Sequence, residues 1–317
     1  MKILFISLTN IGDCILTLPA LDALIERYPR AEFFVVVGPR AREVFAGSKF
    51  IRRVVVYDKQ VGLTEKIGLV WGLYRERCDL VTDLRGTLLS FVLGAKRGNR
   101  LFARYSRVMH MRDRHLLKIR EPETGNREPN YKRHFFQERW GDFDGYGDYV
   151  VIAPGARSGG KRWTAAGFAW VADRLAEQDL NVVLVGDGDD RSIAKEVKSK
   201  MSRPPAADLT GETTLAGLSA LLKQAKLVIC CDSAVLHLAG YLDRPVVAIF
   251  GPTDEDKYGP WSERSVALRA RLSCAPCGKA QCKTKDLACM RAIKREDVLA
   301  AAVRAVANHY PTLPCGE

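Results

Sequence analysis

The chain has 317 residues, of which 47% are hydrophobic, and this length predicts about two domains that each bury a full core. Its 49 Lys and Arg residues outnumber its 37 Asp and Glu residues, and the formal net charge of +12 favours anionic partners: a sugar nucleotide, a phosphorylated glycolipid, a membrane surface or a nucleic acid. No apolar run is long enough to span a membrane and no signal-peptide core follows Met1, so we expect a cytoplasmic protein with mostly free thiols among its nine cysteines.

The first part of the chain alternates strand patterns with helix patterns. Short apolar runs predict strands at residues 3–7, 33–37, 54–57 and 80–82, and longer stretches predict helices at 14–28, near 40–46 and at 63–76. Pro19 lies inside the first helix pattern and is expected to distort that helix or to start its regular part. The alternation predicts a parallel, doubly wound domain. No G-x-G-x-x-G fingerprint follows the first strand, which argues against a dinucleotide-dependent dehydrogenase.

Residues 96–140 form the most basic segment of the chain, with interleaved aromatic residues. A solvated loop face is one interpretation of this composition, and a rim that meets the phosphate or carboxylate groups of an anionic substrate is another. A nucleic-acid surface can look similar, but the segment contains no RNA- or DNA-binding signature. The cations are Lys96, Arg97, Arg100, Arg104, Arg107, Arg112, Arg114, Lys118, Arg120, Arg127, Lys132, Arg133 and Arg139.

A turn-rich segment at residues 141–147, GDFDGYG, predicts a boundary between a first domain at 1–145 and a second at 146–317. The second domain repeats the alternation, with predicted strands at 149–153, 181–185 and near 208–211 and helices at 165–178, 191–201 and 214–223. Its first strand leads into the loop PGARSGGKRW at 154–163. Arg157 and Lys161 lie in this loop, at the carboxyl end of a strand, where cations and backbone N–H groups suit a diphosphate.

The stretch at 226–254 predicts a strand–helix–strand unit, with buried strands at 227–231 and 246–250 around a helix at 234–242. Asp232 and Ser233 follow the first strand and are good N-cap residues, and His237 lies about one turn into the helix. Ligands of open α/β sheets bind at such carboxyl ends, so one interpretation is a diphosphate clamp. A simple N-cap with a buried histidine is the alternative.

Four cysteines near the C-terminal end have the spacing C-x2-C-x4-C-x6-C. Because one short loop would supply four thiolates, zinc or an iron–sulfur cluster could bind there as a structural group. Packed or loosely clustered free thiols are the alternative. The four residues are Cys274, Cys277, Cys282 and Cys289.

Several of these segments together resemble one family. NIGDCILTLPALDALIERYP at 10–29, the loop PGARSGGKRW, and the ordered motifs DLTGETTLAGLSALL, CDSAVLHLAG and PVVAIFGPTD are similar to the heptosyltransferases of glycosyltransferase family nine, which build the inner core of lipopolysaccharide. The Cys-rich segment also resembles one that is common in that family. The resemblance covers nearly the whole chain. Two departures stand out: Ala234-Val235 replace the usual Gly-Pro, and Trp163-Thr164 lacks the usual proline.

The resemblance implies an α/β, GT-B fold, in which two Rossmann-like, doubly wound domains face a central cleft. The domain at 1–145 would lie on the acceptor side. The domain at 146–317 would bind the nucleotide sugar and would carry the Cys-rich tail and a final helix that can cross back to the first domain. By the same resemblance the reaction is an inverting, metal-independent transfer.

The resemblance also implies the catalytic residues, Asp13 and Lys161. Asp13 would be the general base, placed beside Gly12 after the first strand and projecting into the cleft, with a helix cap as the alternative role. Lys161 would relieve charge on the diphosphate leaving group. Because Lys161, Arg157 and the N–H groups at Ser233 and Ala234 would already relieve this charge, no metal would be needed, and no Asp-x-Asp motif stands in a metal-binding context.

The donor site is predicted to include residues from the loops described above. Asp190 would accept hydrogen bonds from the ribose hydroxyls, or would be an exposed turn aspartate, and Thr210 and Gly211 would line the adenine pocket. The donor-binding prediction comprises Gly12, Arg157, Asp190, Thr210, Gly211, Asp232, Ser233, Ala234 and His237.

We therefore expect transfer of a heptose from ADP-heptose to a lipopolysaccharide inner-core acceptor. Arg85, Arg97 and Arg100 would bind the anionic glycolipid, and charge would hold the protein at the inner face of the membrane. A family-nine enzyme with another nucleotide sugar or acceptor, and a catalytically silent sugar-nucleotide binder, remain alternatives. A nucleic-acid partner is not expected.

Overall fold

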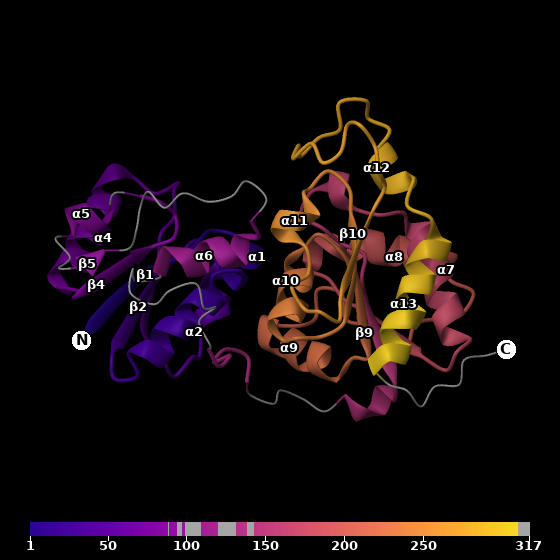
Figure 1. Ribbon diagram of the computed structural model, residues 1–317, viewed down its shortest axis with the longest axis horizontal. Coiled ribbons are helices and arrows are strands. Elements are labelled where there is room, and N and C mark those ends of the chain that lie inside the picture. Colours follow the sequence, from indigo (N-terminus) through magenta and orange to yellow (C-terminus); the bar gives the residue numbers. More distant parts are fainter. Residues whose placement is uncertain (88, 94–96, 99–108, 120–130, 138–142, 310–317) are drawn as a thin grey trace. The chain divides into compact units, whose positions relative to one another are not determined.

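The computed structural model describes residues 1–87, 89–93, 97–98, 109–119, 131–137 and 143–309 (Figure 1). The chain forms two compact units, Met1–Gln137 and Glu138–Glu317, each built on its own sheet. The boundary predicted at 145/146 lies a few residues further along the chain, just before the first strand of the second unit.

The sheet of the first unit has the strand order β3-β2-β1-β4-β5, and every neighbouring pair is parallel. β1 lies at its centre because its apolar run is buried on both faces, as is typical of parallel sheets. The strand order reverses direction beside β1, as in doubly wound folds. The strands are β1 (Lys2–Ile6), β2 (Glu32–Val37), β3 (Ile51–Val56), β4 (Leu80–Asp83) and β5 (Arg97–Gly98).

Pro19 divides the first predicted helix into two. Thr17 is the N-cap of the second piece, in which Pro19 holds an early position where its missing N–H is not required. The Thr17 hydroxyl donates to the carbonyl of Cys14 at 2.6 Å and lies 2.8 Å from Ser7 Oγ, which ties the break to the end of β1. The helices of this unit are α1 (Ile11–Ile15), α2 (Leu18–Arg27), η1 (Pro39–Ala41), α3 (Arg42–Phe45), α4 (Leu63–Arg75), α5 (Leu89–Val92) and α6 (Met111–Ile119).

The sheet of the second unit has the order β11-β10-β9-β6-β7-β8 and is also parallel throughout. The edge strand β11 was not predicted, because a four-residue segment that is only half buried has a weak apolar pattern. The strands are β6 (Tyr149–Ala153), β7 (Asn181–Leu184), β8 (Ala207–Asp208), β9 (Leu227–Cys231), β10 (Val246–Phe250) and β11 (Val266–Arg269).

One hydrophobic core joins several helices of the second unit to this sheet, with Trp163 against Phe168 in an edge-to-face contact. The last helix, α13, packs against α7, β9 and β10 of the same unit, and a crossing back to the first domain stays a prediction. The helices are η3 (Asp144–Tyr146), η4 (Gly159–Lys161), α7 (Ala165–Ala176), η5 (Gly188–Asp190), α8 (Arg191–Lys200), α9 (Leu215–Gln224), α10 (Ala234–Tyr241), α11 (Glu255–Tyr258), α12 (Ala288–Arg291) and α13 (Arg295–His309).

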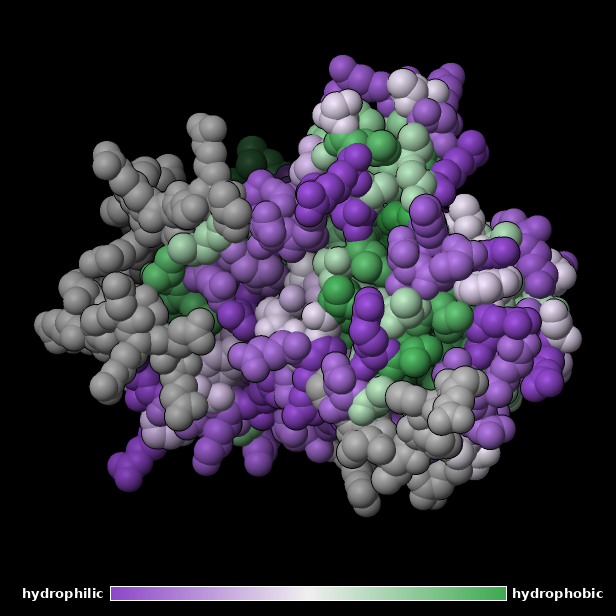
Figure 2. Space-filling model, turned by 45° about the vertical axis from the view of Figure 1, so that its right-hand side comes forward, coloured by the Kyte–Doolittle hydropathy of each residue, from purple (hydrophilic) through white to green (hydrophobic). Residues whose placement is uncertain are grey.

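Hydrophilic side chains cover most of the face shown in Figure 2, with smaller apolar areas between them. Among the helices that the structure describes, none combines the length and the apolar character needed to cross a bilayer.

Candidate active site

The organising feature of the second unit is the carboxyl edge of two adjacent central strands, β6 and β9, which pair in parallel with Ala153 opposite Cys230. The loop at 154–163 leaves the first of these strands, and Asp232 and Ser233 leave the second. Because parallel neighbours end at the same sheet edge, the two segments that were singled out in the sequence lie side by side.

A buried ion pair joins these two segments. Lys161 Nζ lies 2.6 Å from Asp232 Oδ2, and the Asp232 side chain is only 6% exposed whereas that of Lys161 is 32% exposed. His237 Nε2 lies 3.9 Å from the other carboxylate oxygen, Asp232 Oδ1, and the imidazole stacks on Trp261 with ring centroids 6.2 Å apart. A buried carboxylate thus fixes the direction of a lysine whose far side reaches solvent, where it can meet an anion.

The N-terminus of α10 opens at the same edge. Ser233 is its N-cap residue, but the Ser233 side chain makes no capping hydrogen bond, and its buried hydroxyl has no hydrogen-bond partner among the described residues. The first backbone N–H groups of the helix, from Ala234 onward, are therefore available to an anion. Of the alternative interpretation, a buried His237 is confirmed, whereas a capping side chain at Ser233 is not found.

Hydrogen bonds that involve side chains hold the loop at 154–163 in place. The backbone N–H of Trp163 donates to Cys231 Sγ at 3.3 Å, and Arg162 Nε donates to the carbonyl of Ala156 at 2.9 Å. On the outer side, Ser158 Oγ donates to the carbonyl of Ala280 at 2.8 Å. These bonds restrict the loop that carries Lys161. Arg157, also predicted to bind the donor, is exposed in this loop.

Asp190 is not the exposed turn residue of the alternative prediction. Its side chain is 13% exposed, Arg162 Nη2 lies 3.0 Å from its Oδ1, and the backbone N–H of Asp187 donates to its Oδ2 at 3.2 Å. Burial, and after it the charge of Asp187, raises the pKa of Asp190 above its usual value. A Cβ atom on Gly155 would overlap the Asp190 carboxylate, so a glycine is required there. Asp190 thus links two loops, and a contact to the ribose stays a prediction.

Thr210 and Gly211 follow β8 on the same side of the sheet. Thr210 is buried, and its N–H donates to Asp208 Oδ1 at 3.2 Å. Gly211 has a φ of +74°, and Arg191 Nη2 donates to its carbonyl at 3.2 Å. The guanidinium of Arg191 therefore covers Gly211. Arg191 was not predicted as a neighbour of this site, because in the sequence it appears only as the first residue of a helix. Their role in an adenine pocket stays a prediction.

In the first unit, Gly12 and Asp13 lie in α1, which follows the carboxyl end of β1. Asn10 Nδ2 donates to Asp13 Oδ2 at 2.7 Å and orients the carboxylate. The N-cap of α1 is Asn10, so the alternative in which Asp13 caps this helix is wrong. Half-buried and held by one hydrogen bond, Asp13 suits a proton acceptor, a role that stays a prediction.

Arg85 follows β4, at the edge where Asp13 follows β1. Its Nη2 donates to Thr9 Oγ1, and its guanidinium lies 5.3 Å from the ring centroid of Tyr57. Lys118 of α6, not predicted as a site residue, donates to the carbonyl of Leu84 at 2.7 Å, and burial lowers its pKa. Of the other predicted acceptor residues, Arg100 and the side chain of Arg97 lie outside the described residues.

Metal binding by the four cysteines stays a prediction, because their side chains are not gathered into one ligand group in the described structure. Within the described ranges, no group of three or more His, Cys, Asp or Glu side chains is placed to hold a metal ion. Burial raises the pKa of Cys289, and the charges of Cys274, Cys277 and Cys282 raise it further, so the thiols are near one another without converging. Cys289 turns into the core beside Gly251, whereas Cys274 and Cys277 are exposed.

Comparison with known proteins identifies the family. The profile of glycosyltransferase family 9 (heptosyltransferase) matches residues 116–288, more than half of the chain. Lipopolysaccharide heptosyltransferase 3 of Escherichia coli is 27% identical over 82% of this chain and 86% of its own length.

Two solved structures from E. coli share the fold. ADP-heptose lipopolysaccharide heptosyltransferase II superposes with a TM-score of 0.75 at 20% identity, covering 98% of this chain and 99% of its own. A heptosyltransferase solved with ADP gives a TM-score of 0.73 at 19% identity, covering 96% and 100%. The two parallel sheets thus match the GT-B fold, and the chain belongs to glycosyltransferase family 9.

Proposed function

We propose that this glycosyltransferase moves a heptose from ADP-heptose to an acceptor in the inner core of lipopolysaccharide, with inversion at the anomeric carbon. The observation that carries the donor half of this proposal is the Lys161–Asp232 pair beside the open N-terminus of α10. A fixed ammonium group and free helix N–H groups at one sheet edge are what a nucleoside diphosphate requires.

The reaction follows from these groups. The acceptor hydroxyl oxygen attacks the anomeric carbon, the bond from that carbon to the diphosphate oxygen breaks, and ADP leaves with the electron pair. Lys161, Arg157 and the N–H groups at Ser233 and Ala234 stabilise the charge that develops on the leaving diphosphate, without a metal ion. Asp13 accepts the proton of the hydroxyl.

The nucleoside of the donor would extend along the edge of β7 and β8. Thr210 and Gly211 are proposed to contact adenine, and Asp190 to contact the ribose, with Arg162 holding its carboxylate in place. His237, stacked on Trp261 and 3.9 Å from Asp232, would keep Asp232 directed toward Lys161.

The acceptor half of the proposal rests on the family and on charge. The relatives named above are lipopolysaccharide heptosyltransferases, and Arg85 offers a cation at the edge where Asp13 lies. Arg97 and Arg100 would add charge for the carboxylate and phosphate groups of the glycolipid. A formal net charge of +12 supports peripheral binding to the cytoplasmic face of the inner membrane.

Calorimetry with ADP, UDP, GDP and CMP, each with and without Mg²⁺, tests the donor. The proposal predicts that ADP binds most tightly, that Mg²⁺ does not change its affinity, and that Lys161→Ala weakens it. A preference for UDP or GDP would agree with a glycosyltransferase but would assign it a different nucleotide sugar as donor. Absence of binding by all four nucleotides would refute the proposal that the protein is a glycosyltransferase.

A second candidate, a family 9 enzyme with another nucleotide sugar or acceptor, is favoured by one observation. Ala234 and the buried Val235 occupy the positions where the family usually has Gly-Pro, at the first turn of α10. Turnover with an ADP- or UDP-linked sugar other than heptose, at a rate above that with ADP-heptose, would establish this candidate. Binding of ADP-heptose without any turnover would instead indicate a silent binder.

A further inference from the structure

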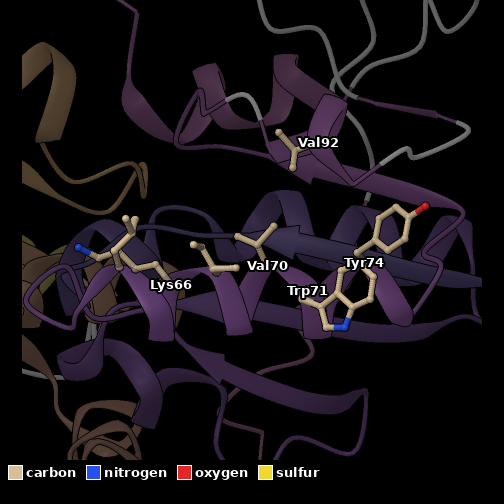
Figure 3. Close-up of a pocket in the computed structure, with 7 residues that line it drawn as sticks. Lys66, Val70, Trp71, Tyr74 and Val92 are labelled. Atoms are coloured by element: carbon tan, nitrogen blue, oxygen red, sulfur yellow. The ribbon is translucent and has the colours of Figure 1, made fainter.

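An apolar groove of about 490 Å³ runs along the outer side of α4 in the first unit. Figure 3 shows Lys66, Val70, Trp71 and Tyr74 arranged along this helix, with Val92 of α5 facing them from the other side. Leu63 and Ile67 complete the lining. Lys66 is the one charged residue among those that line the groove.

This groove gathers most of the exposed large apolar side chains that the described structure contains. Leu63 is 73% exposed, Ile67 59% and Trp71 61%, and Tyr74 and Val92 are also exposed. Among the described residues, the only others in this class are Met1 and Val266. A contiguous exposed apolar surface of this kind marks a site of interaction.

The register of α4 separates most of the groove from the protein core. The residues at 63, 67, 71 and 74 repeat at helical spacing and form an outer stripe. A different side chain, Leu73, is buried against the core, and Leu69 and Val70 pack there as well. The helix is therefore apolar on two sides, and the folded unit buries only one of them.

We propose that this groove docks on the surface of an anionic lipid bilayer, an inference that rests on the proposed function because its glycolipid acceptor is anchored in a membrane. Trp71 and Tyr74 stack with ring centroids 5.7 Å apart, and exposed Trp and Tyr side chains prefer the level of the lipid headgroups. The apolar side chains would enter the headgroup–acyl boundary while Lys66 meets lipid phosphates.

Charge selects a lipid surface over a second copy of this chain. From Leu84 to Arg112 the sequence contains no Asp or Glu, and Val92 of the groove lies within this run. With a formal net charge of +12, the chain would be attracted to an anionic bilayer, whereas a second copy would bring the same excess of positive charge against it. The cations of the run are Arg85, Lys96, Arg97, Arg100, Arg104, Arg107 and Arg112.

The groove is also aligned with the proposed acceptor edge of its unit. α4 leaves the carboxyl end of β3, so Leu63, its first residue, lies at the edge of the sheet where Asp13 and Arg85 follow β1 and β4. Docking of the groove would hold that edge close to the headgroups, where the sugars of a membrane-bound acceptor begin.

Vesicle co-sedimentation of the full chain tests this docking surface. The vesicles are phosphatidylcholine, either pure or with about one-third phosphatidylglycerol. The variant Leu63→Glu/Ile67→Glu places two charges in the groove and keeps Trp71 as a fluorescent reporter. Its matched control, Thr64→Glu/Gly68→Glu, adds the same charges with the same spacing on the same helix, at exposed positions outside the groove; Gly68 has open space for a side chain.

We expect the wild-type chain to bind the anionic vesicles with a blue shift of its fluorescence. The groove variant should bind at least about tenfold more weakly than the matched control, because burial of two large aliphatic side chains is lost. Equal binding by the two variants, or no vesicle binding by the wild type, would overturn the proposal. A wild-type dimer that only the groove variant dissociates would overturn it too, by assigning the groove to a second copy. Calorimetry with ADP distinguishes these outcomes from failure of the proposed transferase function, since the groove variant should keep the wild-type affinity.

Discussion

Replacement of Lys161 by alanine tests whether the buried Lys161–Asp232 pair organises the donor site. The change leaves the Asp232 carboxylate, with its side chain only 6% exposed, without its ammonium partner. Loss of one partner of a fully buried pair costs about 3–5 kcal/mol, and the 32% exposure of the Lys161 side chain lowers our expectation to about 1–3 kcal/mol of unfolding free energy.

The chain offers a matched control for this pair. Lys198 Nζ also lies 2.6 Å from an aspartate, Asp208 Oδ2, but the two side chains are 40% and 22% exposed. A surface pair of this kind contributes about 0.2–1 kcal/mol. The two pairs therefore share their chemistry and distance and differ in burial.

Double-mutant cycles in urea, with the single and double alanine variants of each pair, measure the two coupling energies. We expect a coupling energy for Lys161–Asp232 that exceeds the value for Lys198–Asp208 by about 1 kcal/mol or more. We also expect Lys161→Ala, but not Lys198→Ala, to weaken ADP binding at least about tenfold, because a charge-assisted bond to the diphosphate is lost. Equal coupling energies, or equal ADP affinities, would refute the reasoning.

Three further changes have defined outcomes. Asp13→Asn should reduce turnover by about 10²-fold or more and leave ADP affinity within a few fold, because it removes a proton acceptor without removing a donor contact; unchanged turnover would exclude Asp13 as the base. Gly155→Ala should destabilise the protein by about 1–3 kcal/mol and weaken ADP binding, because the new Cβ overlaps Asp190, whereas Ala at the open position Gly159 should do neither. His115 is buried in α6, and neither of its ring nitrogens has a hydrogen-bond partner among the described residues. Burial is the main cause that lowers the pKa of His115 to about 3. Below pH 6.5 protons therefore bind the unfolded chain preferentially, and the free energy of unfolding decreases as the pH decreases. His115→Leu should remove about 1.4 kcal/mol of the stability lost between pH 7.5 and 5.5, and an identical pH dependence in wild type and variant would contradict this.

The positions of the strand ends were predictable from sequence, and the contacts between the residues that follow them were predictable in part. The run LVICC followed by Asp-Ser indicated a buried strand and an edge site, and the parallel-sheet rule placed that edge beside the loop with Lys161. The pairing of Lys161 with Asp232 was not predicted, because it joins residues 71 apart in sequence and depends on side-chain direction.

Other features depended on tertiary contacts that local patterns do not contain. The turn GDGDD left open whether Asp190 is exposed, and in the structure Asp190 is largely buried beside Arg162 and the backbone of Gly155. The spacing of four cysteines suited a metal, but the sequence does not show that Cys289 is buried in the core whereas Cys274 and Cys277 are exposed. The sequence predicted a helix at 63–76, and only the fold shows that its outer stripe is apolar as well as its buried side.

The most direct test of the proposed function is transfer itself. The purified chain would be incubated with ADP-heptose and a deacylated lipopolysaccharide inner-core acceptor in excess chelator, and the product examined by mass spectrometry and NMR for the added sugar and its anomeric configuration. The account predicts release of one ADP for each heptose transferred, inversion at the anomeric carbon, and loss of turnover in Asp13→Asn and Lys161→Ala. Retention of the anomeric configuration, or turnover that chelator abolishes, would contradict the mechanism proposed for these residues.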